Sequence, residues 1–259
     1  MLKAVAFDLW ETLITNPPDL THTHKHVRLE RMSRILGHPI EALEGPYREV
    51  WNRCQDLYWS RDRDVPCRTQ IEHFLEAMQL ELDESTTQAL EEAYALAIVD
   101  FLPAMIPGAL DVVRELQSRG YRLGLISNTG RTPGYALRAI LDRLGLRFDA
   151  MVFSNEHGEC KPQRSIFEAL RQALEVDFSE MLFVGDNLYV DVYGALQCGI
   201  AAVHFIPSQR GTAVAPPVDH DLVIEPDATI NDLRELLPLI EIARTDRRWS
   251  DVRSARGRP

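Results

Sequence analysis

The sequence predicts an α/β fold: a doubly wound parallel sheet into which an all-helical domain is inserted. After Pro107-Gly108, short apolar runs alternate with segments whose apolar residues recur at helical spacing. This alternation is typical of a parallel sheet with helices on both faces. Between the first apolar run and that region, residues 15–105 show helical spacing alone. We therefore expect a core of residues 1–14 and 106–245 and an inserted domain of residues 15–105.

The elements follow in order from these patterns. A β-branched and aromatic run at residues 4–8 predicts a first strand that ends in Asp8. The helical region breaks near His38-Pro39 and near Asp64-Val65-Pro66. Further strands are expected at residues 121–126, 150–153, 181–185, 200–205 and 222–224. Helices are expected at residues 109–118, 135–144, 162–174, 190–197 and 229–243, with Pro162 in the first turn of the third.

Composition restricts the classes of function. The chain has 259 residues, 45% of them hydrophobic, and a net charge of −11, so nucleic acid is not expected as a partner. No apolar run approaches the roughly 20 residues that span a bilayer, and no signal peptide precedes the first strand. Four cysteines without paired spacing indicate reduced thiols and a cytoplasmic protein. The basic residues of 246–259 indicate a disordered tail.

Four polar residues follow predicted strands, at their ends or on the next turn: Asp8, Ser127, Lys161 and Asp186. Because ligands of such sheets bind at the carboxyl ends of the strands, we expect these side chains to form one active site. An ionised Asp8 could attack phosphorus or an activated carbon. Asp8 and Asp186 offer the hard oxygen ligands that suit Mg²⁺. Taken singly, each residue has a plain alternative, such as a turn or helix cap or a solvated lysine.

The segments that carry these residues are residues 5–14, Leu125–Asn128, Cys160–Pro162 and Val184–Asp191. As a set they resemble the haloacid dehalogenase-like (HAD) superfamily, over residues 4 to about 206. The resemblance implies a Rossmann-like core with a helical cap domain, and a small-molecule substrate. It implies that Ser127 and Lys161 hold a phosphoryl group and that Asp191 positions Lys161 or a metal-bound water. It also places Trp10, Thr12 and Asn128 at the substrate, with the backbone carbonyl of Trp10 as a metal ligand beside Asp8 and Asp186.

Trp10 is where this chain departs from the family. Most phosphatases of the family read Asp-x-Asp at the first motif, whereas this chain reads Asp8-Leu9-Trp10. The second aspartate of that motif protonates the leaving group, and an indole cannot do so. The leaving group then needs little protonation, or another group such as Glu11 or a residue of the inserted domain replaces the acid, or the protein is a slow enzyme or a binder. A packing role for Trp10 is compatible with all three.

Two rival functions follow from this departure. Dehalogenases of the same superfamily also lack an acid at this position, because halide leaves without a proton, but they lack the metal-binding acid of the last motif. This chain keeps Asp186 and Asp191, so we expect a Mg²⁺-dependent phosphatase that acts through an aspartyl-phosphate at Asp8 as a monomer or homodimer. A metal-independent dehalogenase-like hydrolase and a catalytically weak binding protein remain the alternatives.

Two further features of the inserted region are unusual. His22, His24 and His26 alternate at the start of a helix, where side chains two residues apart point to different faces. A transition-metal site is therefore less expected there than a position at the entrance of the cap. Four aromatic residues could pack the cap or shape a pocket that faces Asp8: Trp51, Tyr58, Trp59 and Phe74.

Overall fold

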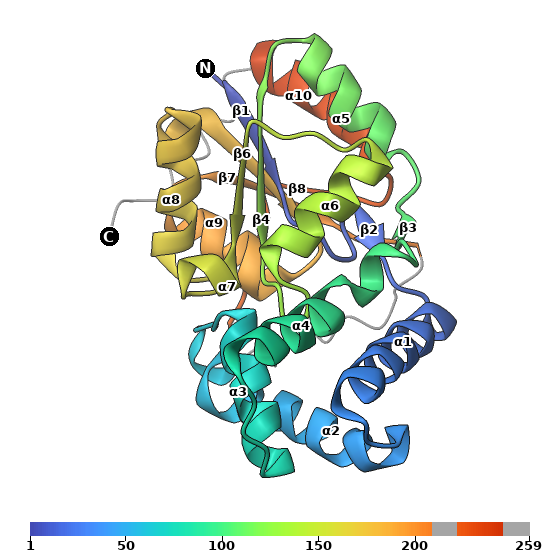
Figure 1. Ribbon diagram of the computed structural model, residues 1–259. Coiled ribbons are helices and arrows are strands. Elements are labelled where there is room, and N and C mark those ends of the chain that lie inside the picture. The colour runs from blue at the N-terminus through green and yellow to red at the C-terminus, as the bar shows by residue number, and fades with distance from the viewer. Residues whose placement is uncertain (209–221, 246–259) are drawn as a thin grey trace.

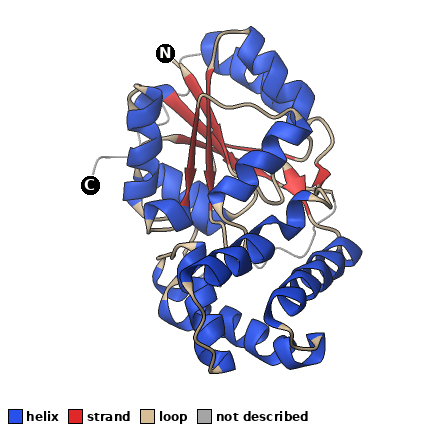
Figure 2. Cartoon of the chain, viewed as in Figure 1, coloured by secondary structure: helices blue, strands red, loops and turns tan. Residues whose placement is uncertain are grey.

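A computed structural model describes residues 1–208 and 222–245, and within them six strands form one parallel sheet. The strands are β1 (Ala4–Phe7), β4 (Arg122–Ser127), β5 (Ala150–Phe153), β6 (Met181–Gly185), β7 (Ala201–Phe205) and β8 (Ala228–Ile230). Their order in the sheet is β5-β4-β1-β6-β7-β8, and helices cover both faces (Figure 2). The predicted α/β fold is thereby confirmed.

Alternation along β1 builds the two layers of the core. Val5 and Phe7 pack on one face, against α5 (Ala109–Ser118), α6 (Gly134–Leu144) and α10 (Leu236–Thr245). The smaller Ala4 and Ala6 pack on the other face, against α8 (Arg164–Leu174) and α9 (Gly194–Gln197). Both layers are visible in Figure 1. The apolar faces are therefore buried on both sides, and polar side chains concentrate at the strand ends.

A block of helices lies in the chain between the two strands of a small antiparallel ribbon, β2 (Ile14–Thr15) and β3 (Ala104–Met105). We call this block the insertion. Its elements are α1 (Pro18–Leu36), α2 (Ile40–Leu57), η1 (Trp59–Arg61), α3 (Cys67–Met78), α4 (Glu84–Ala95) and η2 (Leu96–Val99). They enclose a hydrophobic cluster of their own, which includes Leu29, Phe74 and Leu90.

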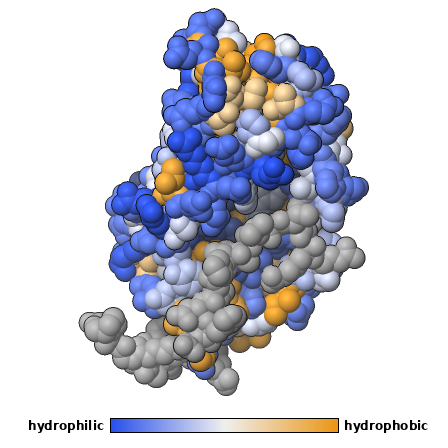
Figure 3. All heavy atoms as spheres, turned by 90° about the horizontal axis from the view of Figure 1, so that it is seen from below, coloured by the Kyte–Doolittle hydropathy of each residue, from blue (hydrophilic) through white to orange (hydrophobic). Residues whose placement is uncertain are grey.

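Seen from below, the molecule is mainly hydrophilic, with separate hydrophobic patches (Figure 3). No helix among the described residues is long and apolar enough to cross a membrane.

The ribbon β2–β3 carries the chain out of the core and back into it, so the insertion is covalently joined to the core at one place (Figure 1).

The structure corrects four predicted element boundaries. The helix expected at residues 162–174 begins only at Arg164, so Pro162 lies before its first turn. Residues 222–224 form no strand, because both backbone and side chain of Asp227 bond to Ala202 and align residues 228–230 with β7 instead. The helix expected from residue 229 therefore starts later, after the capping box of Asp232. Only the second half of the helix expected at residues 190–197 is α-helical, as α9 (Gly194–Gln197), whereas its first half belongs to a π-helical segment, η4 (Leu188–Tyr193).

Asp64 ties the insertion to the core. One of its carboxylate oxygens accepts hydrogen bonds from Thr129 and Ser154 of the core, at 3.0 and 2.5 Å. The other oxygen accepts from the Trp59 indole and the Val65 backbone, both at 2.8 Å. Burial raises the pKa of Asp64, although these four hydrogen bonds each act to lower it. The buried carboxylate is therefore stabilised by neutral hydrogen-bond donors from both the insertion and the core.

Replacing Asp64 by Ala should destabilise the fold by at least about 2 kcal/mol, because it leaves buried donors of Trp59 and Val65 without an acceptor. Asp64→Asn should cost less, since the hydroxyls of Thr129 and Ser154 can accept from the new amide. Chemical denaturation at pH 4 and pH 7 measures both. Because the folded-state pKa of Asp64 is raised, wild-type stability falls as pH rises above the unfolded value of 3.8, and Asp64→Asn lacks this loss. An Ala variant as stable as the wild type would contradict this account.

Candidate active site

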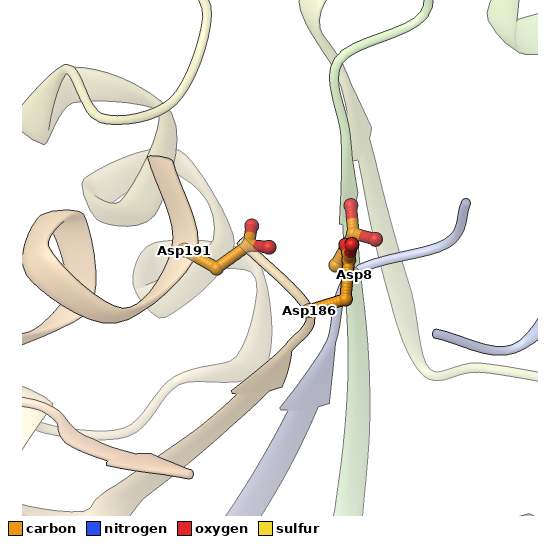
Figure 4. A group of neighbouring side chains, drawn as sticks. All are labelled: Asp8, Asp186 and Asp191. Carbon is orange, nitrogen blue, oxygen red and sulfur yellow. The ribbon is translucent and has the colours of Figure 1, made fainter. Parts of the chain in front are cut away.

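Three carboxylates meet at the carboxyl ends of the central strands. Asp8 follows β1 and Asp186 follows β6, which is its hydrogen-bonded neighbour in the sheet. The backbone N–H of Asp8 donates to the carbonyl of Val184, which continues the pairing beyond β1. Asp191 reaches the same place from η4 (Figure 4). One oxygen of each of the three carboxylates lies within 4.8 Å of the others.

Lys161 joins two of these carboxylates. Its ammonium Nζ lies 2.5 Å from Oδ1 of Asp8 and 2.6 Å from Oδ1 of Asp191. It also donates to the backbone carbonyl of Ile126 at 3.1 Å. Lys161 is 1% exposed, so all three N–H donors of the ammonium are satisfied by protein groups. The carboxylates of Asp8 and Asp191 therefore fix the position of the Lys161 ammonium.

A glycine makes the approach of Asp191 possible. A Cβ added to Gly185 would lie 2.4 Å from Cγ of Asp191, so any other residue there would displace that carboxylate. The side chain of Asn187 caps the turn by accepting from the backbone N–H groups of Tyr189 and Val190. The backbone N–H of Asn187 donates to Oδ2 of Asp191 at 3.0 Å. Both oxygens of Asp191 are thus occupied, one by Lys161 and one by the backbone.

The electrostatics of the site follow from burial and charge. Burial raises the pKa of Asp8 to about 6, against the lowering effect of Lys161, while Asp191 raises it further. Burial alone would lower the pKa of Lys161, but Asp191 and Asp8 outweigh burial and leave it raised. Lys161 is therefore a cation throughout the neutral range. Three carboxylates face one ammonium, which leaves the site with an excess of negative charge.

The remaining residues expected from the resemblance lie around Lys161 and Asp8. Ser127 ends β4 and is fully buried. The amide of Asn128 exchanges two hydrogen bonds with the backbone of Lys161, at 2.9 and 3.0 Å, and so holds the lysine loop. Its contact with substrate stays a prediction. Thr12 is fully buried, and its hydroxyl has no hydrogen-bond partner among the described residues.

Trp10 and Glu11 lie at the turn between β1 and the ribbon. The Trp10 side chain is partly buried and packs against the hydrophobic cluster of the core. Glu11 is 4% exposed and has a positive φ of 61°. Its carboxylate accepts a hydrogen bond from the hydroxyl of Thr15 at 3.0 Å. To protonate a leaving group at Asp8, Glu11 would have to give up this partner at the ribbon.

The three histidines of α1 separate as the helical geometry requires. His24 is buried and its Nε2 lies 2.6 Å from the carbonyl of Phe101, on the segment that returns to β3. Burial lowers the pKa of His24, so the imidazole is neutral at physiological pH. His22 and His26 are exposed. Within the described residues, the one group with metal-ligand spacing is Asp8, Asp186 and Asp191, so no site is formed by the histidines.

Two residues near the site have no signal in the sequence motifs. His204 lies on β7 beside Gly185 and donates from Nε2 to the carbonyl of Asp186 at 3.0 Å. It thereby fixes the backbone of a site residue from the neighbouring strand. Arg131 follows Ser127 by four residues and reaches into the insertion. The sequence pattern predicts that His204 lies on a strand. It does not predict the hydrogen bond to Asp186, because local pattern does not show that β7 pairs with β6.

Comparison with known proteins agrees with the geometry. A family model for haloacid dehalogenase-like hydrolases matches residues 2–199. The chain is similar to a ribulose-1,5-bisphosphate 5-phosphatase of Halopiger xanaduensis, with 29% identity over 93% of this chain and 100% of that protein. It is also similar to an (S)-2-haloacid dehalogenase of Pseudomonas sp. (strain YL), with 28% identity over 93% of this chain and 96% of that one.

A solved structure supports the same relationship. The HAD phosphatase from Thermococcus onnurineus is 28% identical, superposes with a TM-score of 0.57, and is matched over 92% of this chain and 98% of its own. The family match runs from β1 through the segment that carries Asp186 and Asp191. The chain belongs to the haloacid dehalogenase-like hydrolases.

Proposed function

We propose that this hydrolase is a Mg²⁺-dependent phosphatase that acts on a small phosphorylated metabolite through an aspartyl-phosphate at Asp8. The observation that carries the proposal is the placement of Asp186 beside Asp8, with Lys161 held between Asp8 and Asp191. A halide-releasing site has no need of the additional acid. Relatives named as phosphatases, including glyceraldehyde 3-phosphate phosphatases at 26–28% identity, support the same class of substrate.

The donor set fits a magnesium ion. Mg²⁺ prefers one or two carboxylates together with waters and substrate oxygens. Asp8 and Asp186 supply two hard oxygen donors, while both oxygens of Asp191 are taken by Lys161 and Asn187. The bound ion would neutralise charge on the phosphoryl oxygens. The backbone carbonyl of Trp10, implied by the family resemblance, would be the third protein ligand.

Each residue of the site then has its own role in the proposed reaction. Asp8 attacks phosphorus and forms an acyl phosphate as the alkoxide or phenoxide leaves; water later cleaves that intermediate to phosphate and restores Asp8. Ser127 holds a phosphoryl oxygen, and Lys161 does so by exchanging its hydrogen bond to Asp8 for one to the phosphoryl group, with Asp191 and Asn128 positioning Lys161. The insertion acts as a cap that closes over the substrate and excludes bulk water while the phosphoryl group is transferred to Asp8.

A second function is favoured by one observation. Trp10 stands where a phosphatase would carry its acid, and a halide leaving group needs none. The (S)-2-haloacid dehalogenase to which the chain is similar makes this a specific alternative. Release of chloride from a 2-chloro acid in excess EDTA, without phosphatase activity, would favour it. A protein that binds a phosphorylated ligand but turns over neither class would be the catalytically weak alternative.

Replacing Asp186 by Ala should weaken Mg²⁺ binding at least about tenfold, the lower range for loss of even an outer partner of a metal site. Phosphatase activity should fall with it, while the fold survives. Calorimetric titration of Mg²⁺ measures the affinity directly. Asp142→Ala is a matched control, because Asp142 is 77% exposed at the surface. Unchanged Mg²⁺ affinity in the Asp186 variant would contradict the assignment of the metal site.

A further inference from the structure

A segment of the insertion is bonded to the backbone that leads into Lys161. Two backbone hydrogen bonds, of 3.0 and 2.7 Å, join residues 62–64 of the insertion to residues 158–160 of the core. They flank an antiparallel bridge between Arg63 and Glu159. We call residues 62–64 the bridging segment. Because the core side of this bridge ends one residue before Lys161, the insertion holds the backbone that carries the lysine.

The bridging segment also meets the chain beyond the lysine. Asp62 has a φ of 54°, a left-handed conformation that aspartate adopts more readily than most residues do. Oδ2 of Asp62 accepts a hydrogen bond from the side-chain amide of Gln163 at 3.1 Å. Gln163 follows Lys161 by two residues. The insertion is therefore bonded to the core both before and after Lys161.

The side chain of Asp64 reaches the same lysine by a second route, through the loop after β4. Its Oδ2 accepts from the hydroxyls of Thr129 and Ser154, and all three residues are buried. The backbone N–H of Thr129 donates to the Ser154 hydroxyl at 2.8 Å. Thr129 directly follows Asn128, whose amide exchanges two hydrogen bonds with the backbone of Lys161. A continuous series of contacts thus joins Asp64 of the insertion to the lysine.

The Lys161 ammonium depends on this support, because its own contacts change during the proposed reaction. Before substrate binds, Nζ is held by Asp8 and Asp191. The bond to Asp8 is then exchanged for one to the phosphoryl group. Lysine has a flexible four-carbon stem, so the place of the ammonium after this exchange is set largely by the backbone that carries it. A displacement of about 1 Å in a reacting site can lower the rate about 100-fold.

We propose that Asp64 is a positioning residue for Lys161. Through the bridging segment, and through Thr129 and Asn128, the insertion sets the position from which the ammonium meets the phosphoryl group. The inference rests on the role of Lys161 in the proposed phosphatase reaction. The competing explanation is a fastening role, in which these hydrogen bonds only hold the insertion on the core.

A second contact between the insertion and the same loop allows the two explanations to be separated. Thr132 is 5% exposed and Thr129 is 4% exposed. The Thr132 hydroxyl accepts a hydrogen bond from Nη2 of Arg28, a residue of the insertion, at 3.1 Å. This bond joins the insertion to the core without involving Asp64 or the Asn128 amide. A fastening role makes the two threonines equivalent, whereas a positioning role distinguishes them.

The first experiment compares Thr129→Val with Thr132→Val in the full chain, with saturating Mg²⁺ and 4-nitrophenyl phosphate as substrate. Thr129→Val keeps the shape of the side chain but cuts the bond to Asp64. It should lower kcat by roughly 10- to 100-fold and change KM less than about threefold, because Lys161 acts on the phosphoryl group as it is transferred. Thr132→Val should lower kcat less than about threefold. Equal losses in the two variants would overturn the positioning role and establish the fastening one.

Two further variants test whether the effect depends on the hydroxyl and on Asp64. Thr129→Ser restores the hydroxyl and should recover kcat to within about threefold of wild type. Asp64→Ala should lower kcat at least as much as Thr129→Val, and adding Thr129→Val to it should cost less than about twofold more, since both changes cut one route. Losses that multiply in the double variant would refute a shared route. Thr129→Val remains decisive if Asp64→Ala does not fold.

A measurement on the lysine itself does not depend on catalysis. The chain has three lysines, and the side chains of Lys3 and Lys25 are 59% and 44% exposed, against 1% for Lys161. Brief treatment of the folded protein with acetic anhydride, followed by peptide mass spectrometry, gives the acetylation rate of each amine. Thr129→Val should raise the rate at Lys161 by about two- to tenfold, the factor by which loss of one hydrogen bond shifts a local opening. Thr132→Val should leave the rate at Lys161 unchanged, and Lys3 and Lys25 serve as internal references.

The labelling result separates failure of this inference from failure of the proposed function. If Thr129→Val exposes Lys161 but wild type hydrolyses no phosphate ester, the phosphatase proposal fails and the positioning of Lys161 by the insertion stands. If the acetylation rate at Lys161 is the same in Thr129→Val and wild type, the positioning role is refuted, whatever happens to kcat, and the phosphatase proposal is unaffected.

Discussion

Replacing Asp8 by Asn should reduce kcat on every phosphomonoester by at least roughly a thousandfold, as expected when a nucleophile is removed. The amide keeps the size of Asp8, and its oxygen can still accept from Nζ of Lys161. It cannot form an acyl phosphate, because an amide oxygen is a poor nucleophile. The chemistry is therefore lost while the shape of the site is kept.

The same substitution should not destabilise the protein, and the direction of this effect follows from the raised pKa of Asp8. Burial raises the pKa of Asp8 from 3.8 to about 6, so the folded state resists ionisation of this carboxyl more than the unfolded state does. Wild type therefore loses stability as pH rises between about 4 and 6, and Asp8→Asn does not. Unfolding curves at pH 4 and pH 7.5 should show that the free energy of unfolding of the variant increases relative to that of wild type at the higher pH. A collapse of the variant at pH 7.5 would mean that lost turnover reports unfolding.

Trapping the intermediate identifies the nucleophile directly. Acid quenching of wild type during turnover of a ³²P-labelled substrate, followed by peptide mapping, should place the label on the peptide that contains Asp8. The label should be absent from Asp8→Asn and present in Asp142→Ala, whose substitution lies at the surface. An Asp8→Asn variant that turns over within tenfold of wild type would exclude covalent catalysis by this residue.

The core and the meeting of most candidate site residues could be predicted because they depend on local pattern. The run of residues 4–8 alternates between two buried faces, and its polar last residue falls at the edge where ligands bind. The same reasoning brought Asp8, Lys161 and Asp186 together from distant parts of the chain. For Asp8 and Asp186 this inference needs only a strand, its end, and the rule that parallel strands end on one side. Lys161 lies farther from its strand, because the short helix α7 (Ser154–His157), which the sequence did not predict, separates it from β5.

The contacts between the insertion and the core could not be predicted, because they join residues far apart in sequence. Asp64 meets Ser154 across 90 residues, and Arg28 meets Thr132 across 104. Periodicity identifies which side chains are apolar, but it does not say which two helices or loops face each other. β8 was missed for a related reason: its place beside β7 is set by the hydrogen bonds of Asp227 rather than by an apolar run of its own.

Trp10 sets the second large expectation, which concerns the leaving group. A phosphatase without a general acid must expel its leaving group unprotonated, so kcat/KM should fall steeply as leaving-group basicity rises. General acid catalysis contributes about 10²- to 10⁴-fold, and this is the penalty we expect on alkyl relative to acidic aryl phosphates. The packing of Trp10 on the core cluster and the hydrogen bond that Glu11 accepts from Thr15 both support the expectation that neither residue acts as a general acid beside Asp8.

Introducing an acid tests the cause. Trp10→Asp should raise kcat/KM on alkyl phosphates by at least about tenfold while leaving acidic aryl phosphates nearly unchanged, because only basic leaving groups need a proton in the transition state. Trp10→Asn is the matched control: it opens the same space and has the same shape, but it carries no proton at neutral pH. If both variants raise the alkyl rate equally, the indole obstructs the substrate and the missing acid is irrelevant.

The remaining outcome is a wild type whose rate hardly depends on the leaving group, which would mean that another residue supplies the proton. Glu11 is the first to test, since it follows Asp8 by three residues and its carboxylate accepts a hydrogen bond from the neutral hydroxyl of Thr15. Glu11→Gln would then restore a steep dependence without changing the rate on acidic aryl phosphates. His24 is a weaker choice, because it is buried against the carbonyl of Phe101 and its pKa is lowered. A steep wild-type dependence that Glu11→Gln leaves unaltered would instead establish that this enzyme selects substrates by the acidity of the group it expels.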